Sequence, residues 1–109
     1  MLIEKCIIVE GRADKLQLEG VLAEQVLILC TNGTKGEVGL LDMLEPYEDM
    51  PFYTMFDRDK SGEQLRRIMK RIYSDAIQFT VPKPFIQVEE TPRPILAELL
   101  KKQGFSVRI

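Results

Sequence analysis

Two short acidic motifs each follow an apolar run in this sequence. Glu10 follows the run Cys6–Val9, and Asp57 and Asp59 follow the run 52–56. If both runs are neighbouring strands of one parallel sheet, the three carboxylates emerge together at its carboxyl edge, where open α/β sheets bind their ligands. Carboxylates gathered there repel one another unless a cation lies between them, and hard divalent cations take oxygen ligands. The motifs therefore predict a Mg²⁺ site, with Mn²⁺ as a substitute ion.

The residue inventory narrows the chemistry further. The chain has no histidine, which excludes a Ser-His-Asp or Cys-His centre and a zinc site of the usual Cys/His kind. Cys6 and Cys30 both lie in apolar runs, where a thiol usually behaves as a small buried hydrophobe, so a disulfide is not expected. Any catalysis must then depend on carboxylates, lysine, tyrosine or a metal ion.

Length and composition are those of one folded domain. The 109 residues suffice for one core but not for two, and 45% hydrophobic and 29% charged residues are ordinary for a globular protein. The apolar runs are far shorter than the roughly 20 residues of a membrane span, and the N-terminus does not resemble a signal peptide. We therefore expect a single domain over residues 1–109, located in the cytoplasm, with no membrane partner.

Strand and helix patterns alternate along the chain. The predicted strands cover residues 2–9, 26–30, 52–56 and 76–81, with short additional strands over 85–88 and 105–109. The predicted helices are one capped by Asp14 over 15–22, one over 36–44, one capped by Ser61, and one over 94–103. Because parallel neighbours need crossover helices, this alternation predicts a doubly wound, Rossmann-like α/β domain with a mainly parallel sheet flanked by helices.

Two other protein classes share parts of the acidic pattern. Asp57 begins a segment similar to an EF-hand calcium loop, but Ile68 stands where that loop needs its bidentate glutamate. A phosphoacceptor receiver domain has the same fold and an aspartate at the place of Asp57. A receiver has a pair of acidic residues after its first strand, whereas Glu10 stands alone here. A receiver also has a lysine after its fifth strand, and Lys83 lies too early in the chain to fill that place. The receiver remains an alternative in which Asp57 accepts a phosphoryl group.

The chain most resembles the toprim domain, a magnesium-dependent module of topoisomerases, bacterial primases, small nucleases and recombination proteins. The resemblance extends over residues 2–81 and rests on three segments, which are Val9-Glu10-Gly11-Arg12-Ala13-Asp14, Gly33-Thr34 and residues 56–63. The first and last of them look most like the toprim domain of the bacterial ribonuclease that matures 5S ribosomal RNA. Toprim topoisomerases often have a third aspartate where this chain has Ser61, and this difference favours the nuclease or primase branch.

The resemblance implies a role for each residue of the predicted site. Glu10 would act as general acid or base and contribute to the metal site, in which Asp57 and Asp59 would hold Mg²⁺. Basic residues and turn amides around these carboxylates could bind substrate phosphates. The candidates are Arg12, Gly33, Thr34, Lys35, Arg58 and Lys60. The implied function is Mg-dependent phosphodiester chemistry on RNA, DNA or a nucleotide, as a nuclease or nucleotidyl transferase.

A noncatalytic interpretation stays open beside this one. A net charge of −2 is not that of a protein that holds long nucleic acid by itself, and the chain has no room for the domains with which toprim enzymes capture substrate. It could instead bind nucleic acid or nucleotide with a partner protein, without turnover. A cationic helix face could contact the ligand or simply be solvated, and it consists of Arg66, Arg67, Lys70 and Arg71. An edge strand at 85–88 or 105–109 could form a homo-oligomer.

Overall fold

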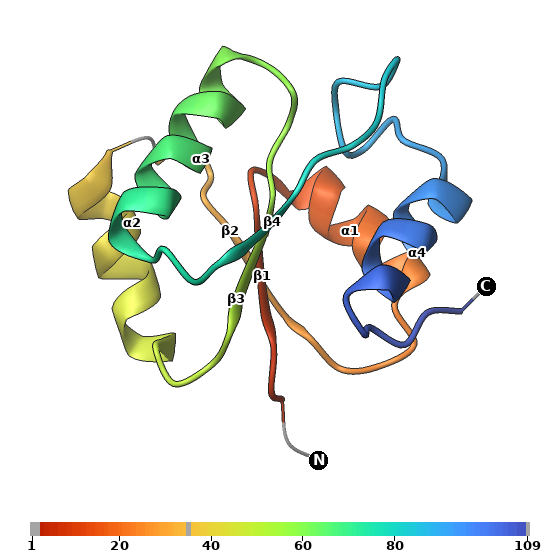
Figure 1. Cartoon of the computed structure of the whole chain (residues 1–109), viewed down its shortest axis with the longest axis horizontal. Helices are drawn as coiled ribbons and strands as arrows, with labels where there is room; N and C mark the ends of the chain where they lie inside the picture. Colours follow the sequence, from red (N-terminus) through yellow and green to blue (C-terminus); the bar gives the residue numbers. More distant parts are fainter. Residues whose placement is uncertain (1–2, 35, 109) are drawn as a thin grey trace.

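A four-stranded parallel sheet forms the centre of the computed structural model, which describes residues 3–34 and 36–108. The strands lie in the order β2-β1-β3-β4, and they are β1 (Cys6–Val9), β2 (Leu27–Cys30), β3 (Phe52–Met55) and β4 (Ile77–Phe79). Each strand pairs with its neighbour in parallel. The predicted doubly wound α/β fold is therefore confirmed, with β1 and β3, the strands before the two acidic motifs, side by side (Figure 1).

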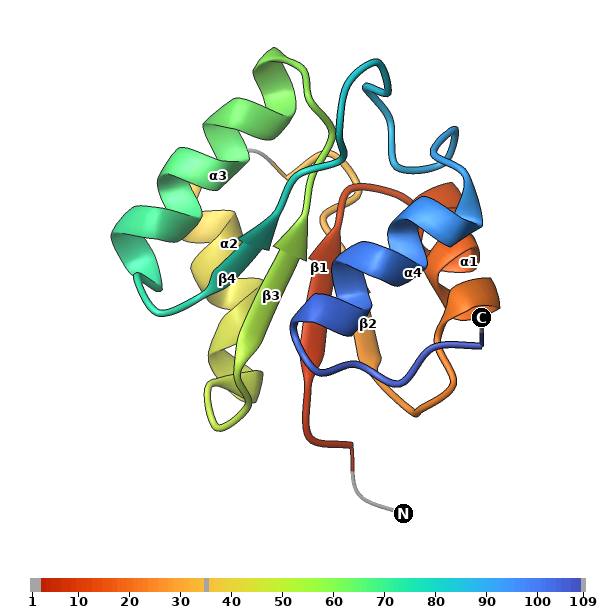
Figure 2. The ribbon, with the colours of Figure 1, turned by 45° about the vertical axis from the view of Figure 1, so that its right-hand side comes forward.

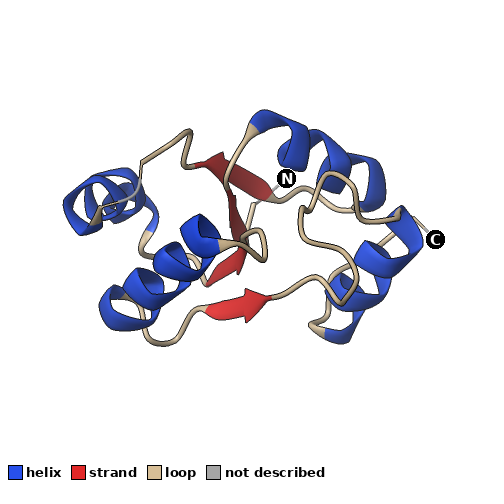
Figure 3. Cartoon of the chain, turned by 90° about the horizontal axis from the view of Figure 1, so that it is seen from above, coloured by secondary structure: helices blue, strands red, loops and turns tan. Residues whose placement is uncertain are grey.

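Two helices cover each face of the sheet, as the view onto its edge in Figure 3 shows. One face carries α1 (Arg12–Val21) and α4 (Arg93–Lys102). The other carries α2 (Glu37–Leu44), continued by the 3₁₀ turn η1 (Glu45–Tyr47), and α3 (Lys60–Ile72). The apolar stripe of α3 is buried as its spacing requires, with Leu65, Ile68 and Met69 against the core. Within the described residues, none of the helices has the length and apolar character needed to cross a membrane.

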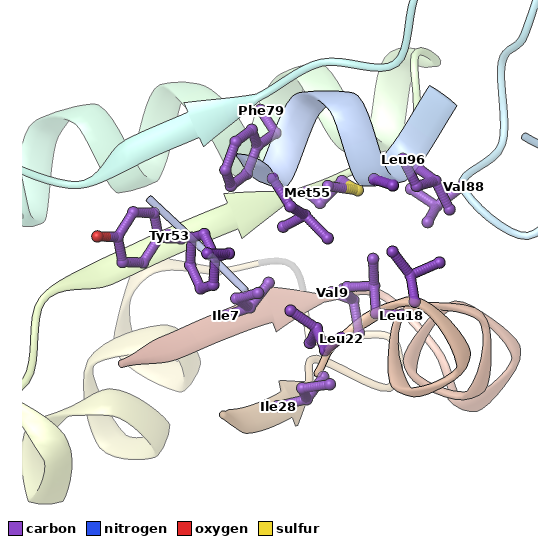
Figure 4. Packing of buried hydrophobic residues seen from close by; sticks show 14 of the residues in the cluster. Ile7, Val9, Leu18, Leu22, Ile28, Tyr53, Met55, Phe79, Val88 and Leu96 are labelled. Carbon is purple, nitrogen blue, oxygen red and sulfur yellow. The ribbon is translucent and has the colours of Figure 1, made fainter. Parts of the chain in front are cut away.

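The core consists of two layers separated by the sheet. Successive strand residues point to opposite faces, so Ile7 and Val9 pack in the layer under α1 and α4, whereas Cys6 and Ile8 pack under α2 and α3. All four residues of β1 are fully buried. Figure 4 shows the first layer, in which side chains of the sheet meet those of α1 and α4. The central strand that leads to Glu10 is therefore packed on both faces.

Both predicted helix caps differ from the observed ones. Gly11 is the N-cap of α1 and Asp14 lies inside the first turn, where its Oδ2 accepts a hydrogen bond from the Gly11 amide at 3.1 Å. Asp59, and not Ser61, caps α3, since its Oδ1 accepts from the Gly62 amide at 2.8 Å. The predictions were wrong because each helix begins earlier than expected, with two residues between β1 and α1 and four residues between β3 and α3.

The strand predicted over residues 85–88 is not formed. These residues belong to an irregular segment over 82–92, here called the strap, that rises from the arrowhead of β4 and crosses to the start of α4 (Figure 2). Two prolines open the strap and have no amide to donate. Of the amides that follow, those of Ile86 and Gln87 donate to Glu90 and that of Val88 donates to Asp57. The backbone donors that a sheet would need are thus used elsewhere.

Other boundaries shift by a few residues. The strand predicted over 2–9 begins at Cys6, and its first residue, Leu2, lies outside the described residues. The strand predicted over 76–81 shortens to β4, and α4 begins one residue before the predicted position. The strand predicted over 105–109 reduces to one antiparallel bridge between Leu22 and Val107, and Ile109 lies outside the described residues. The edges of the sheet are β2 and β4, not the two segments predicted for oligomer contacts.

Candidate functional site

Glu10 and Asp57 meet at the carboxyl edge of the sheet. The register of β1 and β3 pairs Ile8 with Thr54, so the chain leaves both strands at the same level. The Asp57 amide donates a hydrogen bond to Glu10 Oε2 at 2.7 Å. The Glu10 carbonyl in turn accepts from the Asn32 amide after β2 at 2.9 Å, which fixes its backbone. The two acidic motifs are thus joined by a direct contact.

Asp57 is held by two further elements. Its Oδ1 accepts a hydrogen bond from the Val88 amide of the strap at 2.9 Å. Its carbonyl, like that of Phe56, accepts from Nη1 of Arg66 on α3, at 3.0 and 3.2 Å respectively. Arg66 therefore serves as a support for the backbone between the strand and the site, and not as part of the exposed cationic face predicted for α3.

Gly62 allows the first turn of α3 to lie directly against Asp57. A Cβ atom at this position would lie 1.9 Å from the Asp57 carbonyl oxygen, a distance that no side chain can occupy. Gly62 is buried, and its amide also donates to Asp59. The glycine of the second acidic motif is thus required by the close approach of helix and site backbone.

Asp14 is a fourth carboxylate of this edge, although the sequence predicts it as a helix cap and as the last residue of the first toprim-like segment and not as a member of the acidic site. It is buried, with 6% of its surface exposed. Burial raises its pKa to about 6, the nearby charge of Asp57 adds to the shift, and the Gly11 amide opposes it. The sequence signal was its place in the same short motif as Glu10, four residues further along. Its surroundings include Asp57 and Glu89 of the strap, which lie far along the chain, so the motif alone does not indicate that Asp14 is buried.

In the metal-free protein, we expect Asp14 to lower stability as pH rises from about 4 to about 6. Its folded-state pKa lies above the ordinary 3.8, so in this window the folded chain holds the proton more tightly than the unfolded chain and loses relative stability as Asp14 ionises. Asp14→Asn keeps an acceptor for Gly11 and removes the ionisation. Urea unfolding with a chelator should show that wild type loses about 2–3 kcal/mol more than Asp14→Asn across this window. Parallel pH profiles would contradict the expectation.

The carboxylates disfavour one another's charge at this edge. Burial, followed by the charges of Asp57, Asp59 and Asp14, raises the pKa of Glu10, while its bond from the Asp57 amide opposes the shift. Burial also raises the pKa of Asp57, together with the charges of Asp59 and the strap residues Glu89 and Glu90, against the Val88 amide. A cation bound here would relieve this repulsion.

The donor set fits a hydrated magnesium ion. Glu10, Asp57 and Asp59 each use one oxygen to accept a backbone amide, and the other oxygen accepts no hydrogen bond from the described residues. Over residues 3–34 and 36–108, no three acidic or cysteine side chains come close enough to enclose an ion by themselves. Mg²⁺ usually keeps several waters and takes only one or two carboxylates, with substrate phosphates completing its shell. An open set of this kind suits that ion better than a closed protein cage would.

The residues predicted to bind phosphates have different surroundings. Arg12 and Lys60 are exposed at the first positions of α1 and α3, close to the acidic edge. Arg58 is only partly exposed, and its Nη1 donates to the Phe85 carbonyl of the strap at 2.8 Å. Gly33, with φ of 90°, and Thr34 form a turn in which the Thr34 amide donates to Thr31, and Lys35 lies outside the described residues.

The four basic residues of the predicted cationic face of α3 also differ in their surroundings. Arg66 supports the Asp57 backbone, and Arg71 donates to Glu37 of α2 at 2.8 Å. Arg67 remains exposed, with its guanidinium 4.0 Å from Glu63, and Lys70 is exposed as well. Arg66 and Arg71 are therefore held by hydrogen bonds within the chain, whereas Arg67 makes only an exposed ion pair.

A cavity of about 530 Å³ lies at the opposite, amino edge of the sheet. Its wall includes Asp49, Phe52, Tyr73 and Asp75, from the start of β3 and the segments that precede β3 and β4, and none of the predicted site residues. The acidic site is thus remote from this cavity.

Comparison with known proteins places this geometry in a family. No model of a known protein family matches the chain. The chain is 36% identical over 105 residues to the uncharacterized protein YusF of Bacillus subtilis (strain 168), covering 96% of this chain and 72% of that protein. It superposes on a small TOPRIM domain protein from Bacillus stearothermophilus with a TM-score of 0.93 and 37% identity, covering 99% of this chain and 92% of that one. The chain therefore belongs to the small toprim domain proteins.

Proposed function

We propose that the chain is a module for Mg²⁺-dependent phosphodiester chemistry on nucleic acid, as a nuclease or nucleotidyl transferase. The proposal rests mainly on one contact, the hydrogen bond from the Asp57 amide to Glu10 at 2.7 Å. This contact joins a carboxylate suited to proton transfer to the segment that contains the candidate metal ligands. Toprim domains generally bind a divalent metal, which supports Mg²⁺, or Mn²⁺ in its place, as the ion.

Each carboxylate has a distinct part in this proposal. Asp57 and Asp59 would hold the ion with the oxygens that their backbone contacts leave free. When bound, the ion would neutralise charge on the phosphate oxygens during the reaction. Glu10 would give or take the proton of the leaving or attacking oxygen, and its raised pKa brings it nearer to neutral pH, where such transfer is most effective. Arg12 and Lys60 would contact the phosphates from the two sides of the site.

A second candidate is a noncatalytic module that binds nucleic acid or nucleotide with a partner. It is favoured by the charge around the site, where the carboxylates are joined by Glu89 and Glu90 of the strap while Arg58 and Arg66 donate to backbone carbonyls. A polyanion would meet net repulsion there until cations arrive. A partner protein, or a second copy of the chain, would then supply the missing basic surface.

Membership of the toprim family sets the receiver interpretation aside. A receiver needs a lysine after a fifth strand, and the described residues contain four strands in the sheet, with Lys83 in the strap instead.

The metal site is tested by titrating Mn²⁺ into wild type and into Asp57→Asn/Asp59→Asn. Both asparagines keep an acceptor for Val88 and for the α3 cap, so the fold should persist while the two charges are lost. We expect saturable binding in wild type and at least about tenfold weaker binding in the variant. The same samples are then incubated with labelled structured RNA, single-stranded DNA and duplex DNA to identify a substrate.

A charge-matched control is Asp42→Asn/Asp75→Asn, which removes two exposed carboxylates from α2 and from the segment before β4. It should bind Mn²⁺ as wild type does. Binding with cleavage would support the catalytic proposal, and binding without cleavage of any substrate would favour the partner-dependent module. If wild type and Asp57→Asn/Asp59→Asn bind the ion equally weakly, the acidic edge is not a metal site.

A further inference from the structure

Arg58 lies between the two candidate metal ligands but contacts the strap. Its amide donates to the Ile86 carbonyl at 2.7 Å, and its Nη1 donates to the neighbouring Phe85 carbonyl at 2.8 Å. Two successive strap carbonyls are therefore bound by one residue. A guanidinium kept for phosphate binding would be expected to extend from the edge, as the exposed Arg12 and Lys60 do.

Two residues further along, the strap contacts Asp57 itself. The Val88 amide donates to Asp57 Oδ1 at 2.9 Å, and the Val88 side chain is completely buried in the layer that contains Leu18 and Leu96 (Figure 4). The far end of the strap is fixed to α1, because Gln17 Nε2 donates to the Thr91 carbonyl at 2.8 Å. The amide that holds the Asp57 carboxylate is thus itself held between Arg58, the core and α1.

We propose that Arg58 is a positioning residue, which clamps the strap so that the Val88 amide orients the Asp57 carboxylate and leaves its other oxygen for the metal ion. This inference rests on the proposed metal site at Asp57. It differs from the phosphate-binding role expected from the sequence, since Arg58 acts on the ligand through a backbone contact and not on the substrate.

The direction in which Mn²⁺ affinity changes when Arg58 is replaced distinguishes a positioning role from a purely electrostatic one. Removing a positive charge beside a cation site should tighten metal binding, because a repulsion is lost. Loss of the contact between Arg58 and the strap should instead weaken metal binding, because partners that orient a metal ligand typically contribute about 10–100-fold to metal affinity. We therefore expect Arg58→Met to bind Mn²⁺ about tenfold more weakly than wild type.

The experiment measures Mn²⁺ affinity by electron paramagnetic resonance and Val88 amide exchange by NMR. Arg58→Met should show weaker binding and faster Val88 exchange, and Arg58→Lys, which keeps one donor, should recover most of both. The matched control Arg67→Met removes an exposed arginine of α3 and should change neither. Thermal unfolding of each variant in the absence of metal shows whether it is folded.

Three results would overturn the clamp. The first is an unchanged Val88 exchange rate in folded Arg58→Met, and the second is Mn²⁺ binding in that variant that is equal to or tighter than in wild type. The third is a lower salt dependence of nucleic-acid binding, with Val88 exchange and Mn²⁺ affinity both unchanged. That result would assign Arg58 to phosphate binding. If wild type binds no Mn²⁺, that result contradicts the proposed function whatever Arg58 does. The Val88 exchange rate in metal-free protein then decides the clamp alone.

Discussion

Replacing Gly62 with alanine is expected to destabilise the protein by about 3 kcal/mol, lowering Tm by more than about 10 °C. The new methyl group would lie 1.9 Å from the Asp57 carbonyl oxygen, so either α3 or the Asp57 backbone must move. Both movements strain the hydrogen bonds that Asp57 makes with Glu10 and Arg66. Thermal unfolding measures the first effect, and we expect Mn²⁺ affinity to fall with it.

The matched control is Gly20→Ala in α1, where the atoms nearest to the added methyl group belong to the flexible end of Arg93. Since alanine is a better helix former than glycine by about 1 kcal/mol, this variant should be as stable as wild type or slightly more so. If Gly62→Ala behaves like Gly20→Ala in both stability and metal affinity, the close approach of α3 to Asp57 is not the reason for the glycine.

Glu10→Gln is expected to lower the rate of phosphodiester cleavage by at least about 100-fold, on the substrate that wild type cleaves. The glutamine oxygen can still accept the Asp57 amide, so the edge of the sheet should keep its geometry. The change removes the ability to give or take a proton and one negative charge of the candidate metal donor set, which is why the rates are compared at saturating Mg²⁺. Single-turnover rates at saturating Mg²⁺ measure the loss in the chemical step.

Glu63→Gln serves as the control for this change, because Glu63 is an exposed carboxylate in the first turn of the neighbouring α3. It should retain nearly the full rate. A Glu10→Gln protein that cleaves as fast as Glu63→Gln would show that Glu10 is not the proton-transferring group, even if the metal site is correct.

The arrangement of the two acidic motifs could be predicted because it depends on local patterns. The apolar runs before Glu10 and Asp57 form buried strands, and the helical patterns between strands required parallel crossovers. Once β1 and β3 are neighbours, their register alone brings the two carboxylates to one edge. These are properties of segments a few residues long, which the sequence displays directly.

The supports of the site could not be predicted because they come from distant segments. The contact between Asp57 and Val88 joins residues 31 positions apart, and the prolines of the strap indicate irregular backbone without indicating its path. The same limit explains why Arg58 and Arg66 looked like solvent-facing cations. An arginine that donates to a backbone carbonyl and one that awaits a phosphate have the same sequence pattern.

The long separation between Asp57 and Val88 has a consequence for the order in which the protein is made. During synthesis from the N-terminus, β1, β2 and β3 leave the ribosome before the strap exists, so Glu10 can pair with Asp57 early. The second bond of Asp57 must wait until residue 88 has emerged and Val88 has entered the core. A nascent chain therefore lacks the complete set of contacts around Asp57. On the proposed function, the site that would capture the metal ion is therefore completed late in maturation.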